Sequence, residues 1–234
     1  MDRKPLETGI IQELPSEIQI KWFNSQKNGT FGRMGVNGEG SCFFHSVLSI
    51  LNPYNFINLT EDKQIELANK FRCSFSQSFT LDEFDQLTRR TEEKNDEPNF
   101  RQRGEERLKK IEREYKNAQK VFCQPKVWAD ETNIRIVSNL LNLNLIFVDF
   151  SKKNEVYCSM HGDESLKNLD ECHPVNKLQK TGIIAWIERS HFEPIVRIDN
   201  KSTGEITTLF DPENPKDSEF LLHFMSTYKQ ECNL

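Results

Sequence analysis

The stretch from Gly38 to Leu51 constrains the fold of this chain more than any other segment. It reads Gly-Glu-Gly-Ser-Cys and then turns apolar, so two glycines, which permit a tight loop with positive φ, stand just before Cys42. The apolar residues recur at near-helical spacing and predict a buried helix that ends near Asn52. They are Phe43, Phe44, Val47, Leu48 and Leu51. The pattern therefore places a cysteine at the first turn of a buried helix.

This placement of Cys42 allows two interpretations. The free backbone N–H groups and the positive dipole at the start of a helix lower the pKa of a thiol and favour the nucleophilic thiolate. A free cysteine beside aromatic residues is, however, also typical of a buried structural position. The segment alone leaves both interpretations open, and a catalytic role requires a base elsewhere in the chain.

His191 and Glu193 can supply that base and a group to orient it. They lie in the apolar segment 191–198, which predicts a strand after the turn at 188–190. Residues two apart in a strand point to the same face, so the imidazole and the carboxylate would lie side by side. The carboxylate could then fix the tautomer of the ring while the other ring nitrogen takes the thiol proton. The alternative is an ordinary histidine at the start of a strand.

Hydrophobic periodicity and turn residues predict the remaining elements. Thr60 and Thr80 can cap two helices, and Thr80 forms a capping-box pattern with Glu83. We expect a helix over 133–141, a C-terminal helix over 218–228, a turn at 28–29, and strands over 18–22, 143–149, 156–158, 182–187 and 205–210. The nearly continuous apolar run at 143–149 predicts a strand that is buried on both faces.

The segment 89–116 is unusually charged. Eighteen of its 28 residues are charged, ten basic and eight acidic. A single apolar stripe nevertheless predicts a helix with a narrow buried seam that leans on the domain, formed by Leu108, Ile111, Tyr115, Ala118 and Phe122. A solvated helix face is the default interpretation, and a partner-binding arm is the alternative. Because the charges nearly cancel here and the whole chain carries −5, we expect no nucleic-acid partner.

Length and composition bound the class of protein. With 234 residues the chain forms one domain or at most two. No apolar run approaches the roughly 18 residues of a membrane span, and no secretory signal is visible, so we expect no membrane association. The six cysteines are scattered, which predicts free thiols in a reducing, cytoplasmic compartment.

A zinc site is a weaker possibility in the sequence. Cys158, His161, Cys172 and His173 supply four potential ligands. Their spacing matches no strong zinc pattern, and ligands that are adjacent in sequence are awkward to arrange around one ion. We therefore predict no metal and no cofactor.

Three segments together resemble the ovarian-tumour (OTU) family of cysteine proteases. The segment around Cys42 is similar to the family's cysteine motif, which often reads Asp-Gly-Asn/Ser-Cys-Leu/Phe-Phe, and Trp128-Ala129-Asp130 is similar to its Trp-Gly-Asp segment. Ser190-His191-Phe192-Glu193 resembles the family's strand of His, aromatic and Asp/Asn/Glu. The order and spacing agree over residues 32–198, and three ordered motifs are far more specific than any one.

The resemblance implies a papain-like α+β fold, in which a twisted central β-sheet is flanked by helices. It implies an OTU-like cysteine protease domain over 32–210 that includes a charged helical arm at 82–122. Residues 1–31 would form an N-terminal extension packed on the domain, and 211–234 would hold the C-terminal helix. In this family the arm region often touches the ubiquitin bound on the distal side of the scissile bond.

The resemblance also implies the role of each site residue. Cys42 would be the nucleophile and His191 the general base and then acid, with Glu193 at the orienting position. Glu39 corresponds to the family's Asp three residues before the cysteine, in the loop that shapes the oxyanion hole, and the backbone N–H groups of Gly40, Ser41 and Cys42 would bind the oxyanion. Both acidic positions carry Glu where Asp is common, which leaves the third triad member open between Glu193 and Glu39.

The implied function is a cysteine isopeptidase that removes ubiquitin, or a ubiquitin-like modifier, through a thioester on Cys42. The implied partners are ubiquitin or polyubiquitin chains, and we expect a monomer. Two alternatives stay open: a catalytically weak ubiquitin-binding module on the same scaffold, and a protease for another substrate. The Gly-Glu-Gly-Ser-Cys form favours a viral or effector protein, located in the host cytoplasm or associated with the virion.

Overall fold

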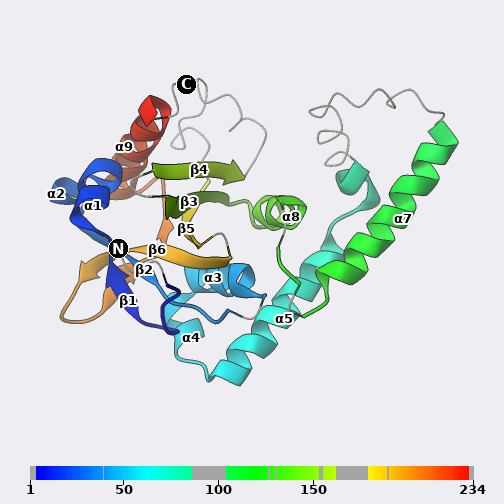
Figure 1. Ribbon diagram of the computed structural model, residues 1–234, viewed down its shortest axis with the longest axis horizontal. Helices are drawn as coiled ribbons and strands as arrows, with labels where there is room; N and C mark the ends of the chain where they lie inside the picture. The colour runs from blue at the N-terminus through cyan, green and yellow to red at the C-terminus, as the bar shows by residue number, and fades with distance from the viewer. Residues whose placement is uncertain are drawn as a thin grey trace.

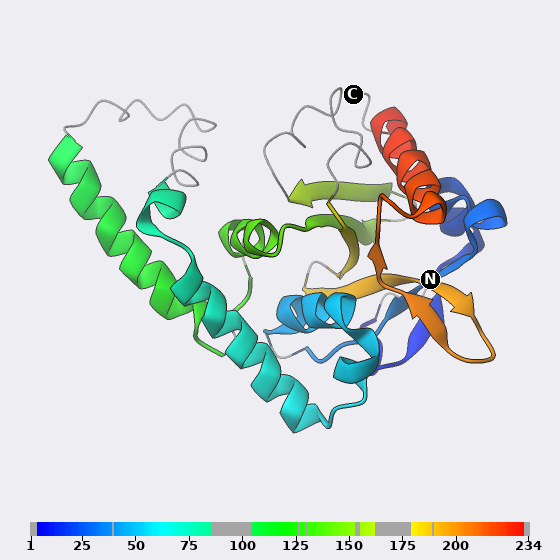
Figure 2. The same cartoon turned by 180° about the vertical axis from the view of Figure 1, so that it is seen from behind.

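The described residues form the α+β fold with a sheet flanked by helices that the sequence predicts (Figure 1). The computed structural model describes residues 4–38, 40–85, 104–125, 127–129, 131–152, 155–161, 179–188 and 190–231. Helices lie on both sides of the sheet, and the same arrangement is visible from behind in Figure 2.

The described strands form one eight-stranded sheet, with β1-β2-β6-β5-β3-β4 as its main order. Its pairs are antiparallel except for β3 and β5, which run parallel. Short β7 pairs with β6, and short β8 pairs with β5. The strands are β1 (Ile11–Glu13), β2 (Thr30–Met34), β3 (Asn144–Lys152), β4 (Glu155–His161), β5 (Thr181–Ile187), β6 (His191–Asn200), β7 (Glu205–Thr207) and β8 (Leu209–Phe210).

Two groups of helices cover the sheet. They are α1 (Ser16–Phe23), α2 (Ser25–Asn28), α3 (Cys42–Leu51), α4 (Pro53–Ile57), α5 (Glu61–Ser78), α7 (Gly104–Phe122), α8 (Glu131–Leu141) and α9 (Pro215–Glu231). A further short helix spans residues 81–85. Helices α3, α5, α7 and α8 contribute to one hydrophobic cluster, whereas α1 and α9 contribute to another.

Strand β3 separates these two clusters. Leu145 and Phe147 point into the cluster of α3 and α8, whereas Ile146 and Val148 point into the cluster of α1 and α9. This alternation confirms the prediction that the apolar run at 143–149 is buried on both faces. Strand β4 contains the strand predicted at 156–158 and pairs with β3. The predicted capping box is also present, since the amides of Thr80 and Glu83 are each bound by the other's side chain.

The predicted strand at 18–22 is wrong, because residues 16–23 form helix α1. Ile18, Ile20 and Trp22 alternate as in a strand, but Ile20 is 51% exposed. The buried face instead has helical spacing and includes Trp22 and Phe23, whose rings lie 5.6 and 5.5 Å from that of Phe224 on α9. Packing against α9 therefore decides the structure of this segment, since the local pattern fits either element.

The N-terminal segment is closely joined to the sheet. Strand β1 pairs with β2, and β2 pairs with the histidine-bearing strand β6. A Cβ on Gly35 would lie only 2.1 Å from the carbonyl oxygen of Glu7, so this close backbone contact requires glycine. The proposed division into 1–31, 32–210 and 211–234 stays a prediction, although β2 crosses its first boundary.

Helix α7 leans on α5 with one narrow apolar stripe, as predicted for the charged segment (Figures 1 and 2). Ile111 and Phe122 are each 2% exposed, and the Tyr115 hydroxyl donates a 2.9 Å hydrogen bond to the carbonyl of Phe79 beyond the end of α5. Leu108 departs from the prediction because it is 57% exposed. The start of the charged segment, residues 89–103, lies outside the described residues.

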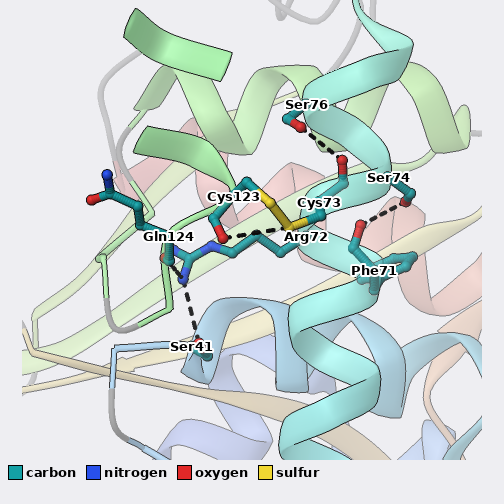
Figure 3. The surroundings of a disulfide bond; sticks show 8 residues. All are labelled: Ser41, Phe71, Arg72, Cys73, Ser74, Ser76, Cys123 and Gln124. Atoms are coloured by element: carbon teal, nitrogen blue, oxygen red, sulfur yellow. Dashed lines mark hydrogen bonds between the residues drawn. A yellow bond between two sulfur atoms is a disulfide. The ribbon is translucent and has the colours of Figure 1, made fainter. Parts of the chain in front are cut away.

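A disulfide joins Cys73 of α5 to Cys123, directly after α7 (Figure 3). The prediction that all six cysteines are free thiols is therefore wrong for this pair. The two residues are 50 positions apart in sequence, and only the antiparallel packing of α5 on α7 brings them together. Cys42 is free, and the side chains of Cys158, Cys172 and Cys232 lie outside the described residues.

We expect the free energy of unfolding of the Cys73→Ala/Cys123→Ala variant to be about 2–4 kcal/mol lower than that of the oxidised wild type. The reason is that the disulfide restricts a long loop of the unfolded chain. Urea unfolding without reductant measures this difference. Reductant should lower the midpoint of the wild type and leave that of the variant unchanged. Equal midpoints in the absence of reductant would contradict the bond.

Candidate active site

Cys42 is the first residue of α3 and is 3% exposed. The loop before it turns at Gly40, whose φ of 79° is the positive value that the sequence predicts for one of its glycines. The Ser41 amide donates to the Gly38 carbonyl at 3.1 Å, which closes the turn. The side chain of Asn37 donates to Glu61 on α5 at 2.8 Å and anchors the start of the loop.

Helix α3 is fixed to strand β6 beside the candidate histidine. The Ser46 hydroxyl, one helical turn after Cys42, donates to the Phe192 carbonyl at 3.0 Å. The backbone of Phe192 also lowers the pKa of the Cys42 thiol, against the larger effect of burial, which raises it. Because Phe192 follows His191 directly, the hydrogen bond from Ser46 brings the predicted nucleophile and the predicted base to one junction of α3 and β6.

Burial raises the pKa of the Cys42 thiol above its ordinary value. Hydrogen bonding from the backbones of Phe192, Phe43 and Cys42 lowers the pKa, as does the charge of Arg72, but burial has the larger effect. The expectation of a lowered thiol pKa at a helix start is therefore wrong for the free chain. The amides at the start of α3 are present as predicted, but they lower the thiol pKa by less than burial raises it.

His191 is the first residue of β6 and is 6% exposed. Burial, and then the charge of Arg33, lower the pKa of its imidazole to about 4. A Cβ on Gly38 would lie 3.8 Å from Nδ1, so that ring nitrogen faces the loop before Cys42. At neutral pH the ring is uncharged and can accept a proton.

Glu193 lies beside His191 on the same face of β6, as the i, i+2 spacing predicts. Its Oε1 is 3.6 Å from His191 Nε2, which is longer than a hydrogen bond, and that buried nitrogen has no hydrogen-bond partner in the described structure. The carboxylate instead accepts from Arg33 at 2.8 Å and from the Leu6 amide at 2.6 Å. The third-member role of Glu193 stays a prediction.

Arg33 and the N-terminal segment are the parts of this site that sequence reasoning missed. Arg33 is 1% exposed and also donates to the carbonyl of Lys4 and to the Gln12 side chain, each at 2.9 Å. A lone arginine in the apolar stretch Phe-Gly-Arg-Met is the available signal, because a buried charge requires a partner. Nothing in the local sequence names Glu193 as that partner.

The structure describes only part of the predicted oxyanion loop. The Ser41 amide is occupied by the Gly38 carbonyl, so Gly40 and Cys42 are the candidate backbone donors that remain. Glu39, the alternative third member, lies outside the described residues. The oxyanion role of Gly40, Ser41 and Cys42 and the catalytic role of Glu39 stay predictions.

The predicted motif Trp128-Ala129-Asp130 lies between helix α7 and helix α8. Trp128 is 52% exposed and Ala129 packs against the α3 cluster, whereas Asp130 lies outside the described residues. Helix α8 follows and leads into β3, which is the predicted order of helix and core strand. The motif therefore positions structural elements around the site and brings no described side chain to the thiol.

No group of three or more metal-ligating side chains occurs in the part of the chain that the structure describes. The side chains of Cys158 and His161, and all of Cys172 and His173, lie outside that part. In the same part, no helix combines the length and apolar character that crossing a bilayer requires.

Comparison with known proteins finds similarity only among solved structures. No protein-family model and no curated protein matches the sequence. The OTU domain of OTUD1 is 13% identical, with 76% of this chain and 92% of that chain covered at a TM-score of 0.45. An OTU domain in complex with ubiquitin is 13% identical, with 87% and 88% covered at a TM-score of 0.46. The ubiquitin-bound OTU of Hazara virus is 14% identical, with 73% and 83% covered at a TM-score of 0.42.

These structures are OTU domains, which is the family that the three sequence motifs resemble.

Proposed function

We propose that the protein is a cysteine isopeptidase that removes ubiquitin or a ubiquitin-like modifier from proteins or chains through a thioester on Cys42. The observation that carries this proposal is that helix α3, which begins at Cys42, is joined to strand β6, which begins at His191. The Ser46–Phe192 hydrogen bond of 3.0 Å makes this link. A thiol, an uncharged imidazole and a carboxylate 3.6 Å from that imidazole are the groups that nucleophilic acyl transfer needs.

The electrostatics favour a neutral resting pair over a preformed ion pair. Burial raises the pKa of Cys42 and lowers that of His191 to about 4, so both groups are uncharged near pH 7. His191 therefore removes the thiol proton as Sγ attacks the carbonyl carbon of the modifier's C-terminal glycine. The backbone amides of Gly40 and Cys42 are the proposed donors to the oxyanion, and one such donor is worth about 3 kcal/mol of barrier.

The same imidazole then completes the reaction. His191 gives its proton to the departing lysine amine as the isopeptide bond breaks, which leaves the modifier as a thioester on Cys42. Water, deprotonated by His191, attacks the thioester carbonyl, and the thiolate leaves and is reprotonated. These steps use only side chains, backbone amides and water, so the proposal includes no metal or cofactor.

A ubiquitin probe with a C-terminal electrophile tests the proposal. We expect one adduct per chain on wild type and none on Cys42→Ala, with the modified residue identified by peptide mass spectrometry. Cys73→Ala/Cys123→Ala is the matched control, because it removes two disulfide-bonded cysteines outside the site and should still be labelled. Absence of labelling on folded wild type, or labelling on a cysteine other than Cys42, would refute the proposal.

A catalytically weak ubiquitin-binding module is the second candidate, favoured by the engagement of Glu193 with Arg33 and Leu6 instead of His191. Tight ubiquitin binding with slow thioester turnover would select it. Probes made from other modifiers, used in competition with the ubiquitin probe, would identify a protease for a different modifier.

A further inference from the structure

We propose that Arg72 of α5 is a positioning residue for Cys42, which tethers the start of α3 and stabilises the negative charge of the thiolate. This proposal rests on the proposed function in that Cys42 is taken as the nucleophile. Its test measures the thiol itself and needs no ubiquitin.

The guanidinium of Arg72 is buried directly behind the active-site loop. Arg72 is 0% exposed, its Nη1 lies 3.4 Å from the Ser41 hydroxyl, and its charged carbon sits 4.6 Å from the centre of the Phe44 ring. Ser41 and Phe44 flank Cys42 at the first turn of α3, so the arginine contacts the helix start on both sides of the nucleophile.

Arg72 is held in place by the segment that follows α7. Nη1 donates to the Gln124 carbonyl at 2.8 Å and Nη2 donates to the Val127 carbonyl. Figure 3 shows that this segment begins at Cys123, the partner of Cys73 in the disulfide, and that the side chain of Arg72 extends from α5 to lie between Gln124 and Ser41. The disulfide that joins α5 to the end of α7 is therefore adjacent in sequence to Gln124, whose carbonyl accepts from the Arg72 guanidinium.

The charge of Arg72 is available to the thiolate because all the partners that the described structure shows for it are neutral. They are two carbonyls, one hydroxyl and one aromatic ring. Burial lowers the pKa of Arg72 to about 10, and the Cys42 charge opposes this shift, so the guanidinium remains protonated at neutral pH. A buried cation that pairs with no carboxylate among the described residues attracts a nearby anion strongly, since little solvent screens it.

Among the described residues, two histidines are further titratable groups near the junction of α3 and β6, where Glu193 is paired with Arg33. His191 lies on β6 and His45 on α3 itself, and burial lowers the pKa of both to about 4. Neither carries a charge near pH 8. Arg72 is thus the cation that the described structure places against the first turn of α3 when the thiol ionises.

The test is the rate at which iodoacetamide alkylates Cys42 near pH 8, followed by mass spectrometry of the Cys42 peptide. Arg72→Gln keeps hydrogen-bond donors for the carbonyls but removes the charge. We expect its alkylation to be about tenfold slower, which corresponds to a rise of about one unit in the thiol pKa. Arg72→Lys keeps the charge and should recover most of the wild-type rate.

Arg197→Met is the matched control for the loss of a buried arginine. Arg197 is 4% exposed and paired with Asp199 and Asp217 away from Cys42, so this variant should lose stability without slowing alkylation. Arg72→Met is a second neutral variant, should Arg72→Gln fail to fold. An unchanged rate in a folded neutral variant, or equal slowing in Arg72→Lys, would overturn the proposal.

The outcomes separate this proposal from the proposed function. Labelling of wild type by the ubiquitin probe together with normal alkylation of Arg72→Gln would refute the role of Arg72 alone. Slow alkylation of Arg72→Gln together with no labelling of wild type would refute the isopeptidase and support the role of Arg72 in stabilising the thiolate.

Discussion

Replacement of His191 by alanine is expected to lower kcat/KM of the proposed isopeptidase by about 10²- to 10⁴-fold, the range that positioned acid–base groups contribute. His191 would take the thiol proton and later protonate the amine, so both halves of the reaction lose their proton carrier. Hydrolysis of a fluorogenic ubiquitin substrate measures the effect. His223→Ala, a histidine change on α9 outside the site, should retain activity.

The same histidine sets the expected acid limit of activity. Because burial and Arg33 lower the pKa of His191 to about 4, the ring stays unprotonated well below the ordinary histidine value of 6.5. As pH falls, kcat/KM should therefore hold through pH 6 and 5 and decline only near pH 4. A decline centred between about pH 6 and 7 would show that His191 titrates normally and is less buried than the structure places it.

The largest stability effect is expected at Arg33. Its guanidinium and the Glu193 carboxylate are 1% and 0% exposed and 2.8 Å apart. Replacement by methionine leaves a buried carboxylate without its cation, which should lower the free energy of unfolding by about 3–5 kcal/mol. Urea unfolding followed by circular dichroism measures the loss.

Two comparisons isolate this ion pair. Arg33→Met/Glu193→Gln removes both charges and keeps an acceptor for the Leu6 amide, so it should be substantially more stable than Arg33→Met. Lys27→Met breaks an exposed ion pair with Glu219 and should cost at most about 1 kcal/mol. If Arg33→Met costs no more than Lys27→Met, the pair is hydrated and the buried geometry is incorrect.

Much of the candidate site at the junction of α3 and β6 could be predicted because its signals are local. The glycines before Cys42, the helix after it and the i, i+2 spacing of His191 and Glu193 each depend on a few neighbouring residues, and the structure contains each arrangement. The apolar run that forms β3 is equally local, as is the stripe that joins α7 to α5.

The errors arose where long-range packing outweighs a local pattern. Residues 18–22 alternate like a strand, but Trp22 and its neighbour Phe23 pack on α9 and are helical. The thiol at a helix start should have a lowered pKa, yet the surrounding core desolvates it and raises the pKa. Both corrections depend on residues far away in the sequence.

The sequence by itself determined which chemistry this chain carries: a thiol at a helix start, and an imidazole with a carboxylate two residues later on one strand face. The tertiary structure alone decided how those groups are held and charged. It paired Glu193 with Arg33, set Arg72 behind Cys42 and joined Cys73 to Cys123. Side-chain spacing within an element follows from local backbone geometry, whereas desolvation and ion pairing depend on which distant segments fold against it.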